Sequence, residues 1–294
     1  MKLPLFVLAA GVPLAMGGAA SAEPSASPDL SATGASRNVK ATLLSEVDSI
    51  QPGQTLWLGL KLEMGEGWHV YWKQAGDAGL PPKLKWTLPA GFVAGPIAWP
   101  YPVRFDAGGV TSYGYHDQEL LLVPVTAPAN AAPGSSVPLS AAASWLECRE
   151  VCLPGKAALG LSLPVKAGAA VRNPATSGLF KETRALLPKS ARGWTFSGTG
   201  DHVVLEAPAT WRPPTTPVEF FAADDNVILY AAPQAAKAGP GPFRLELKRD
   251  PNGSLPAALS GVLVARRGEV VEALEISAKP KTRETAHSKK GDHP

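Results

Sequence analysis

The residues best suited to chemistry are the chain's two cysteines, Cys148 and Cys152. A pair of thiols this close in sequence can form a disulfide that opens and closes by thiolate attack. A metal site would need further ligands, and the candidates His69, His116 and Met64 lie at no ligand-like spacing from the cysteines. We therefore predict one Cys148–Cys152 disulfide, no metal site and no cofactor.

The first 22 residues predict export from the cytosol, where thiols stay reduced. Lys2 is followed by the apolar run 3–20 and by small residues up to Ala22 that fit a signal-peptidase site. The run is short and contains two prolines, which argues against a permanent membrane anchor. We expect a signal peptide at 1–22 and no integral membrane segment after its cleavage.

Geometry limits how the two cysteines can be bonded. A disulfide requires Cα atoms within about 7 Å, whereas four steps along a straight strand cover about 13 Å. One helical turn or a tight hairpin satisfies this limit, and we favour a hairpin with its turn at 149–151 because 136–145 and 157–165 resemble strands. So short a loop constrains the unfolded chain by only about 2 kcal/mol. A structural bridge and a redox-active bridge are both open on this basis.

Composition and charge indicate an all-β protein with no nucleic-acid function. Short apolar runs divided by 30 prolines and 29 glycines are typical of β-sandwiches. A second series of strand-like segments follows a helix predicted at 177–187, and it predicts a second, smaller β-sandwich. The 28 Lys and Arg exceed the 25 Asp and Glu because of basic residues in 279–294, so the body is nearly neutral.

The expected organisation has five segments along the chain. These are a signal peptide at 1–22, a flexible leader at 23–37, a first β-domain with the cysteines at 38–168, a second β-domain at 169–278, and a disordered basic tail at 279–294. Both cysteines lie in the first β-domain, so we expect the functional site there.

Several motifs of the first domain form a recognisable set. They are Trp145-Leu-Glu-Cys148-Arg-Glu-Val-Cys152-Leu-Pro154, Gly67-Trp68-His69-Val-Tyr71-Trp72 with Gly76-Asp77-Ala-Gly79-Leu80-Pro81, and Ile97-Ala-Trp99-Pro100-Tyr-Pro102 with Tyr113-Gly114-Tyr115. Over roughly 39–165 the chain resembles the N-terminal periplasmic domain of the DsbD family of thiol:disulfide interchange proteins, and most of all its copper-sensitivity-suppressor (ScsB-like) branch. Val218-Glu-Phe220-Phe221 and Gly261-Val-Leu-Val264 look like the extra β-domain of that branch.

This resemblance implies an immunoglobulin-like β-sandwich in the periplasm whose Cys148 and Cys152 relay electrons to or from thioredoxin-like partners. It implies an activity of the protein-disulfide reductase type. The sequence shows neither the transmembrane segment nor the thioredoxin-like C-x-x-C domain of full-length relatives, so we expect a separate membrane electron donor. Two alternatives are a non-redox interaction module with a structural disulfide and a copper-handling protein.

The resemblance also implies an aromatic cap over the cysteines. Its counterpart here is 99–115, with Tyr101 or Phe105 as the covering ring. The strand with His69 and Tyr71 is expected beside the pair, and Trp145 completes the predicted pocket. His69 and Tyr71 also fit ordinary strand and core positions.

Local charge favours one sulfur as the exchanging one. Lys156 lies four residues beyond Cys152 and could favour its thiolate, whereas Glu147 lies beside Cys148 and disfavours one. Arg149 acts against this distinction. We predict Cys152 as the exchanging sulfur and Cys148 as the resolving one.

Overall fold

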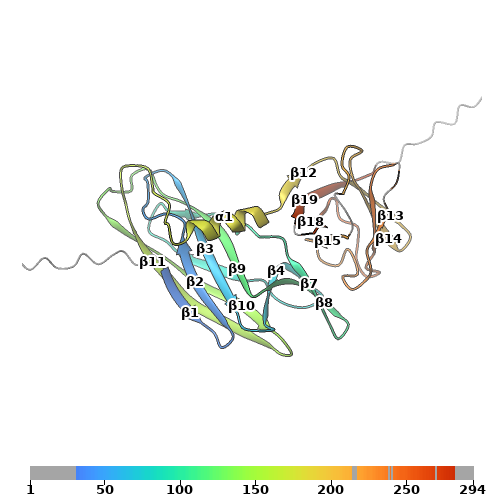
Figure 1. Ribbon diagram of the computed structural model, residues 1–294, viewed down its shortest axis with the longest axis horizontal. Helices are drawn as coiled ribbons and strands as arrows, with labels where there is room; N and C mark the ends of the chain where they lie inside the picture. The colour runs from blue at the N-terminus through green and yellow to red at the C-terminus, as the bar shows by residue number, and fades with distance from the viewer. Residues whose placement is uncertain (1–30, 214–216, 238, 240, 269, 282–294) are drawn as a thin grey trace, which may run out of the picture.

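The computed structural model describes residues 31–213, 217–237, 239, 241–268 and 270–281. The predicted signal peptide, the leader up to residue 30 and the tail from residue 282 lie outside these residues. β-strands dominate the described chain, as predicted, and they form two β parts side by side (Figure 1). Among the described residues, no helix combines the length and apolar character that a membrane crossing requires.

The first part is a sandwich of two antiparallel sheets. One has the strand order β1-β2-β3-β9-β6, and the other has the order β11-β10-β4-β8-β7, with β5 paired to β10. Alternate residues of β3, such as Leu58, Leu60 and Leu62, are fully buried between the sheets together with Trp72 of β4. The bounds are β1 Ser31–Ala35, β2 Val39–Ser45, β3 Thr55–Met64, β4 His69–Gly76, β5 Lys83–Thr87, β6 Val93–Ala94, β7 Val103–Ala107, β8 Val110–His116, β9 Gln118–Thr126, β10 Ser136–Cys148 and β11 Cys152–Pro164.

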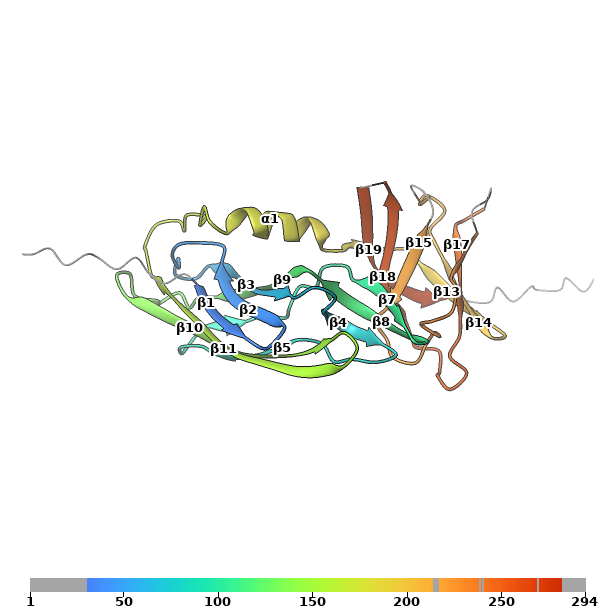
Figure 2. The same cartoon turned by 60° about the horizontal axis from the view of Figure 1, so that its bottom comes forward.

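Helix α1 (Ser177–Leu186) covers the outer face of the first sheet, where Figure 2 shows it above β3 and β9. Its Phe180 is fully buried against Leu120 and Leu122 of β9. Gly59 of β3 leaves the space for these side chains, because a Cβ there would lie 2.6 Å from Leu120. The helix predicted from the sequence is confirmed to within one residue.

The second part is built on one sheet with the order β15-β18-β19-β13-β14-β17-β16 and with β12 paired to β19. Strand β19 runs antiparallel to β18 and parallel to β12 and β13, so it joins two groups of strands. Buried side chains of both parts belong to one contiguous apolar core. The bounds are β12 Lys189–Ala191, β13 Thr195–Thr199, β14 His202–Glu206, β15 Val218–Ala222, β16 Ala235–Lys237, β17 Arg244–Lys248, β18 Leu259–Arg267 and β19 Val270–Pro280.

Two segments differ from the sequence-based expectation. Strand β1 lies within the segment expected to be a flexible leader, and it pairs with β2 from Ser31 to Ala35. The predicted cap loop at 99–115 instead contains the hairpin β7–β8, which turns at Gly108 and Gly109 with positive φ. Both are local hairpins, but the small residues Ser-Ala-Thr-Gly-Ala of β1 and the prolines and glycines within 99–115 carry little strand signal.

Candidate redox site

The two cysteines close the tip of a long hairpin. Strands β10 and β11 pair in register from Ser136↔Pro164 to Cys148↔Cys152, and the terminal pair is joined by a disulfide with its Cα atoms 4.1 Å apart. Within the turn, the Arg149 N–H donates to the Val151 carbonyl at 3.2 Å. The predicted hairpin and disulfide are confirmed, and the continuous ladder explains why the cysteines lie directly opposite each other.

The two sulfur-bearing residues differ sharply in exposure. Cys148 is only 2% exposed and forms a buried cluster with Tyr71 and Ala75, against which Leu146 packs. Cys152 is exposed. An incoming thiolate can therefore reach Cys152, while Cys148 is shielded.

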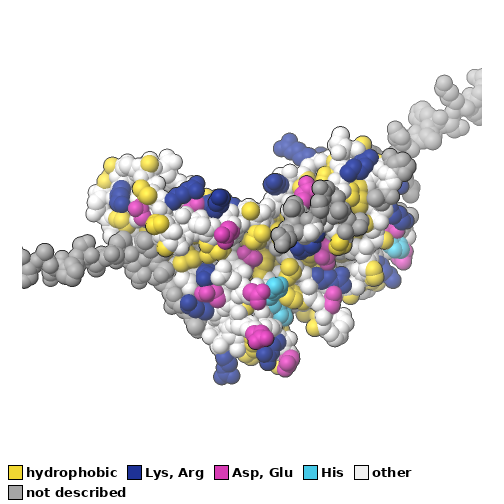
Figure 3. Space-filling model, viewed as in Figure 1, with side chains coloured by type: hydrophobic (Ala, Val, Ile, Leu, Met, Phe, Trp, Pro, Cys, Tyr) yellow, Lys and Arg dark blue, Asp and Glu magenta, His cyan; other side chains and the backbone are white. Residues whose placement is uncertain are grey.

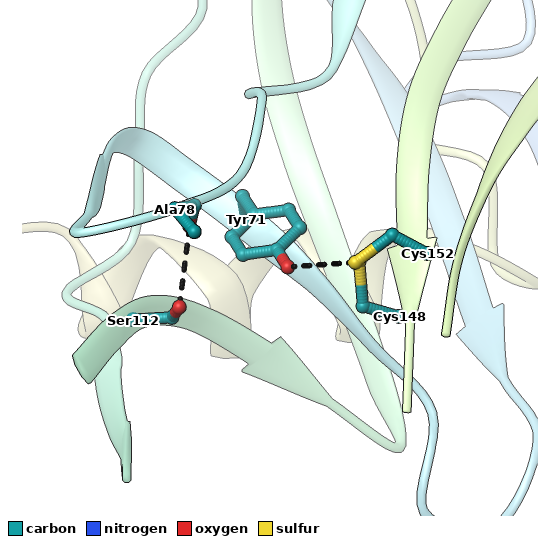
Figure 4. The surroundings of a disulfide bond; sticks show 5 residues. All are labelled: Tyr71, Ala78, Ser112, Cys148 and Cys152. Carbon is teal, nitrogen blue, oxygen red and sulfur yellow. Dashed lines mark hydrogen bonds between the residues drawn. A yellow bond between two sulfur atoms is a disulfide. The ribbon is translucent and has the colours of Figure 1, made fainter. Parts of the chain in front are cut away.

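Tyr71 of β4 points its hydroxyl at the disulfide, as Figure 4 shows. The phenol oxygen lies 3.6 Å from the Cys152 Sγ. Because a disulfide sulfur has no hydrogen, the phenol is the donor, and burial raises the pKa of Tyr71 so that the proton is retained. The loop after β4 packs closely against this ring at Gly79. A side chain does not fit there, because φ is +124° and a Cβ would lie 2.2 Å from the ring.

His69 and Phe105 form an aromatic stack next to the disulfide. His69 pairs with Cys148 across β4 and β10, and its ring stacks on Phe105 at 4.7 Å and meets Tyr71 edge-on at 5.3 Å. Burial lowers the pKa of His69, so the imidazole is neutral at pH 7. Phe105 thus covers His69, and Cys152 stays exposed.

Trp145 faces the opposite side of β10 from Cys148 and is buried in the main core. Its indole N–H donates to Glu147 at 3.1 Å. Glu147 is fully buried and also accepts bonds from the Asn38 amide at 3.0 Å and from the Ser36 hydroxyl. Sequence reasoning missed this polar cluster, although the two-residue spacing of Trp145 and Glu147 on a strand places them on one face.

Tyr101 is not brought to the sulfurs. Its ring lies under the Arg266 guanidinium at 5.6 Å, and its backbone N–H donates to the Leu186 carbonyl at 3.1 Å. None of these described contacts involves Cys148 or Cys152. These contacts place Tyr101 at the junction of the two β parts.

The charges expected to distinguish the sulfurs act differently in the fold. Lys156 lies about 13 Å along β11 from Cys152, which exceeds the screening length of about 8 Å in physiological salt. Arg149 lies over the Trp68 ring at 5.7 Å, and Glu147 is on the far face of β10. The difference in exposure therefore distinguishes the sulfurs better than local charge does.

On the face of the molecule seen in Figure 3, positively and negatively charged side chains are interspersed.

The described residues contain no group of three or more His, Cys, Asp or Glu side chains placed to hold a metal ion. A disulfide with one exposed cysteine is chemically suited to thiol–disulfide exchange.

Comparison with known proteins gives matches in family and in fold. Residues 40–163 match the family model described as thiol:disulfide interchange protein DsbD, N-terminal. The N-terminal periplasmic domain of ScsB from Proteus mirabilis is similar in structure, with a TM-score of 0.63 and 15% identity, over 85% of this chain and 99% of that one. The YadV chaperone aligns at 12% identity over 80% of this chain and 98% of its own, with a TM-score of 0.21. A search of curated proteins gave no match.

Proposed function

Because residues 40–163 belong to the family of DsbD N-terminal domains, we propose that this chain is a thiol–disulfide interchange protein that passes electrons through Cys148 and Cys152 to or from a thioredoxin-like partner. The observation that carries this proposal is the asymmetry of the disulfide. An exposed Cys152 is joined to a Cys148 that is 2% exposed. Exchange with a partner requires an accessible sulfur, whereas a purely structural disulfide does not.

The exchange is balanced with two thiols of the partner. A partner thiolate attacks the Cys152 Sγ, the Cys148–Cys152 bond breaks, and the electron pair leaves on Cys148, which takes up a proton. The partner's second thiolate then attacks the partner sulfur of the mixed disulfide. Cys152 leaves as a thiolate and takes up a proton. This chain gains two electrons and two protons, and the partner is oxidised to a disulfide. The same steps in reverse reduce a partner.

Tyr71 assists the exchange in either direction of electron transfer. Its hydroxyl, 3.6 Å from the Cys152 Sγ, donates to that sulfur and stabilises negative charge when Cys152 leaves or attacks as a thiolate. The stack of His69 and Phe105 supports the Tyr71 ring from the side. A neutral His69 adds no charge that would oppose or favour either sulfur.

The proposed setting is the periplasm, with a separate membrane protein as the electron donor. Support comes from the family match and from the fold shared with the ScsB periplasmic domain. A thioredoxin-like partner fits because such proteins present one nucleophilic thiol at a protruding site, and Cys152 lies at the tip of the β10–β11 hairpin.

Single-cysteine variants test the proposal. Purified thioredoxin with one active-site cysteine is loaded with thionitrobenzoate and mixed with Cys148→Ser or Cys152→Ser protein, and release of the coloured thiol reports the mixed disulfide. We expect the Cys148→Ser variant, which retains Cys152, to react at least about tenfold faster than the variant that retains buried Cys148. If neither variant forms the mixed disulfide, the proposal fails and a role in binding alone explains the fold better.

A further inference from the structure

Tyr230 of the second β part contacts two strands of the first part, and both strands border the disulfide site. Its hydroxyl accepts a hydrogen bond from the Gln74 amide of β4 at 2.8 Å. Its ring meets the Tyr113 ring of β8 at 5.5 Å in a T-shaped arrangement. Tyr230 is only 6% exposed, so these contacts form the buried junction of the two parts.

Gln74 lies in the irregular portion of β4, where the pairing register with β8 shifts between Tyr71 and Gly76. Its side-chain carbonyl accepts from the Gly76 N–H at 2.8 Å, and its amide donates to Asp225 at 3.1 Å as well as to Tyr230. Gln74 is 7% exposed. A buried amide with its donor and acceptor groups in use fixes the backbone around it, because any shift leaves a polar group without a partner.

The residue after Gln74 lies in the same buried cluster as Cys148. Ala75 belongs to the buried cluster that contains Tyr71 and Cys148. Gln74 therefore contacts the second part while the adjacent Ala75 helps to cover Cys148. A constraint on one of these neighbouring residues acts directly on the other.

The β7–β8 hairpin shows the same division between its two faces. Arg104 is paired with Tyr113 and donates to the Ala231 carbonyl of the second part at 3.2 Å. The next pair, Phe105 with Ser112, faces the site, and the Ser112 hydroxyl donates to the Ala78 carbonyl at 3.2 Å beside Tyr71 (Figure 4). Since neighbouring residues of a strand point to opposite faces, the second part and the disulfide lie on opposite sides of this hairpin.

We propose that Tyr230 is a positioning residue of the disulfide site: it holds β4 and β8 in place so that Ala75 and Tyr71 cover Cys148 while Cys152 stays open. The second β part then has a defined task, which is to direct thiols to one sulfur of the pair. This inference deepens the proposed function and rests on it, because it concerns the same two sulfurs.

Alkylation of Cys148 tests the inference without any partner protein. In the Cys152→Ser background Cys148 is the single thiol, and iodoacetamide modification followed by mass spectrometry gives its rate. We expect Tyr230→Ala to raise this rate about tenfold, which corresponds to about 1.4 kcal/mol, and Tyr230→Phe, which keeps the ring, to raise it less. The matched control is Leu245→Ala, which opens a cavity in the core of the second part, where Leu245 pairs with Leu205 and Ala236.

A faster rate in Tyr230→Ala with an unchanged rate in Leu245→Ala supports the inference. Equal acceleration in both variants overturns it, since general loosening of the second part would then be the cause, and so does an unchanged rate in Tyr230→Ala. If Tyr230→Ala does not fold, Tyr230→Phe decides: a rise of about threefold supports the inference and the unaltered rate overturns it. Failure of this test is separate from failure of the thioredoxin reaction at Cys152, which would remove the proposed function itself.

Discussion

Replacement of Glu147 by alanine should destabilise the first β part strongly. The carboxylate is fully buried and accepts hydrogen bonds from Trp145, Asn38 and Ser36. In Glu147→Ala the indole N–H of Trp145, itself 4% exposed, is left without an acceptor, at a cost of about 1–3 kcal/mol. Asn38 and Ser36 are partly exposed, so water replaces much of their loss. We expect a total of about 3 kcal/mol.

Urea denaturation followed by tryptophan fluorescence measures this effect. With an m-value of about 3 kcal/mol per M, a loss of about 3 kcal/mol lowers the midpoint by about 1 M while the slope stays unchanged. Glu150→Ala is the matched control because it removes the same charge from the nearby turn, where the Glu150 side chain is 85% exposed, and it should change stability by less than about 0.5 kcal/mol. Equal midpoints for Glu147→Ala and Glu150→Ala would show that the buried carboxylate contributes no more to stability than the exposed one.

Three further predictions concern the pH dependence of stability, the reactivity of Cys152 and the contribution of the disulfide to stability. Burial raises the pKa of Glu119 from 4.5 to about 7, so the ionisation of Glu119 lowers the stability of the folded protein as the pH rises through this interval. The free energy of unfolding of Glu119→Gln should exceed that of the wild type by about 3 kcal/mol at pH 8 and equal it at pH 4. Equal free energies of unfolding at both pH values would contradict this. Tyr71→Phe in a Cys148→Ser background should slow alkylation of Cys152 about tenfold at pH 7, because the thiolate loses its donor; an unchanged rate argues against that role. The double variant Cys148→Ala, Cys152→Ala should stay folded and lose about 2 kcal/mol, or about 4–8 °C in Tm, and a protein unable to fold would favour a structural bridge.

The disulfide hairpin could be predicted because short-range geometry decides it. Only a helical turn or a tight hairpin brings residues four apart within bonding distance, and the alternating Leu159, Leu161 and Leu163 favour the hairpin because they indicate a strand that follows it. The all-β class followed from the same alternation and from the distribution of prolines and glycines.

The rest depends on contacts between distant residues. Glu147 is satisfied by Ser36 and Asn38, which lie more than a hundred residues away, and no local pattern reveals such a partner. The resemblance implied that Tyr101 or Phe105 covers the cysteines, but contacts with Arg266 and α1 set the place of Tyr101. The unequal exposure of the cysteines arises from Tyr71 and Ala75 of β4, so it required the packing of that strand against the hairpin.

The proposed exchange of electrons between the Cys148–Cys152 disulfide and a thioredoxin-fold protein can be measured directly. The most direct measurement mixes the purified oxidised chain with a small excess of reduced thioredoxin, quenches with acid, alkylates, and counts modified cysteines by mass spectrometry, with dithiothreitol as the positive control for reduction. We expect both cysteines to become alkylated while an equal amount of thioredoxin is oxidised. A disulfide that dithiothreitol reduces but thioredoxin leaves intact would contradict the proposed exchange.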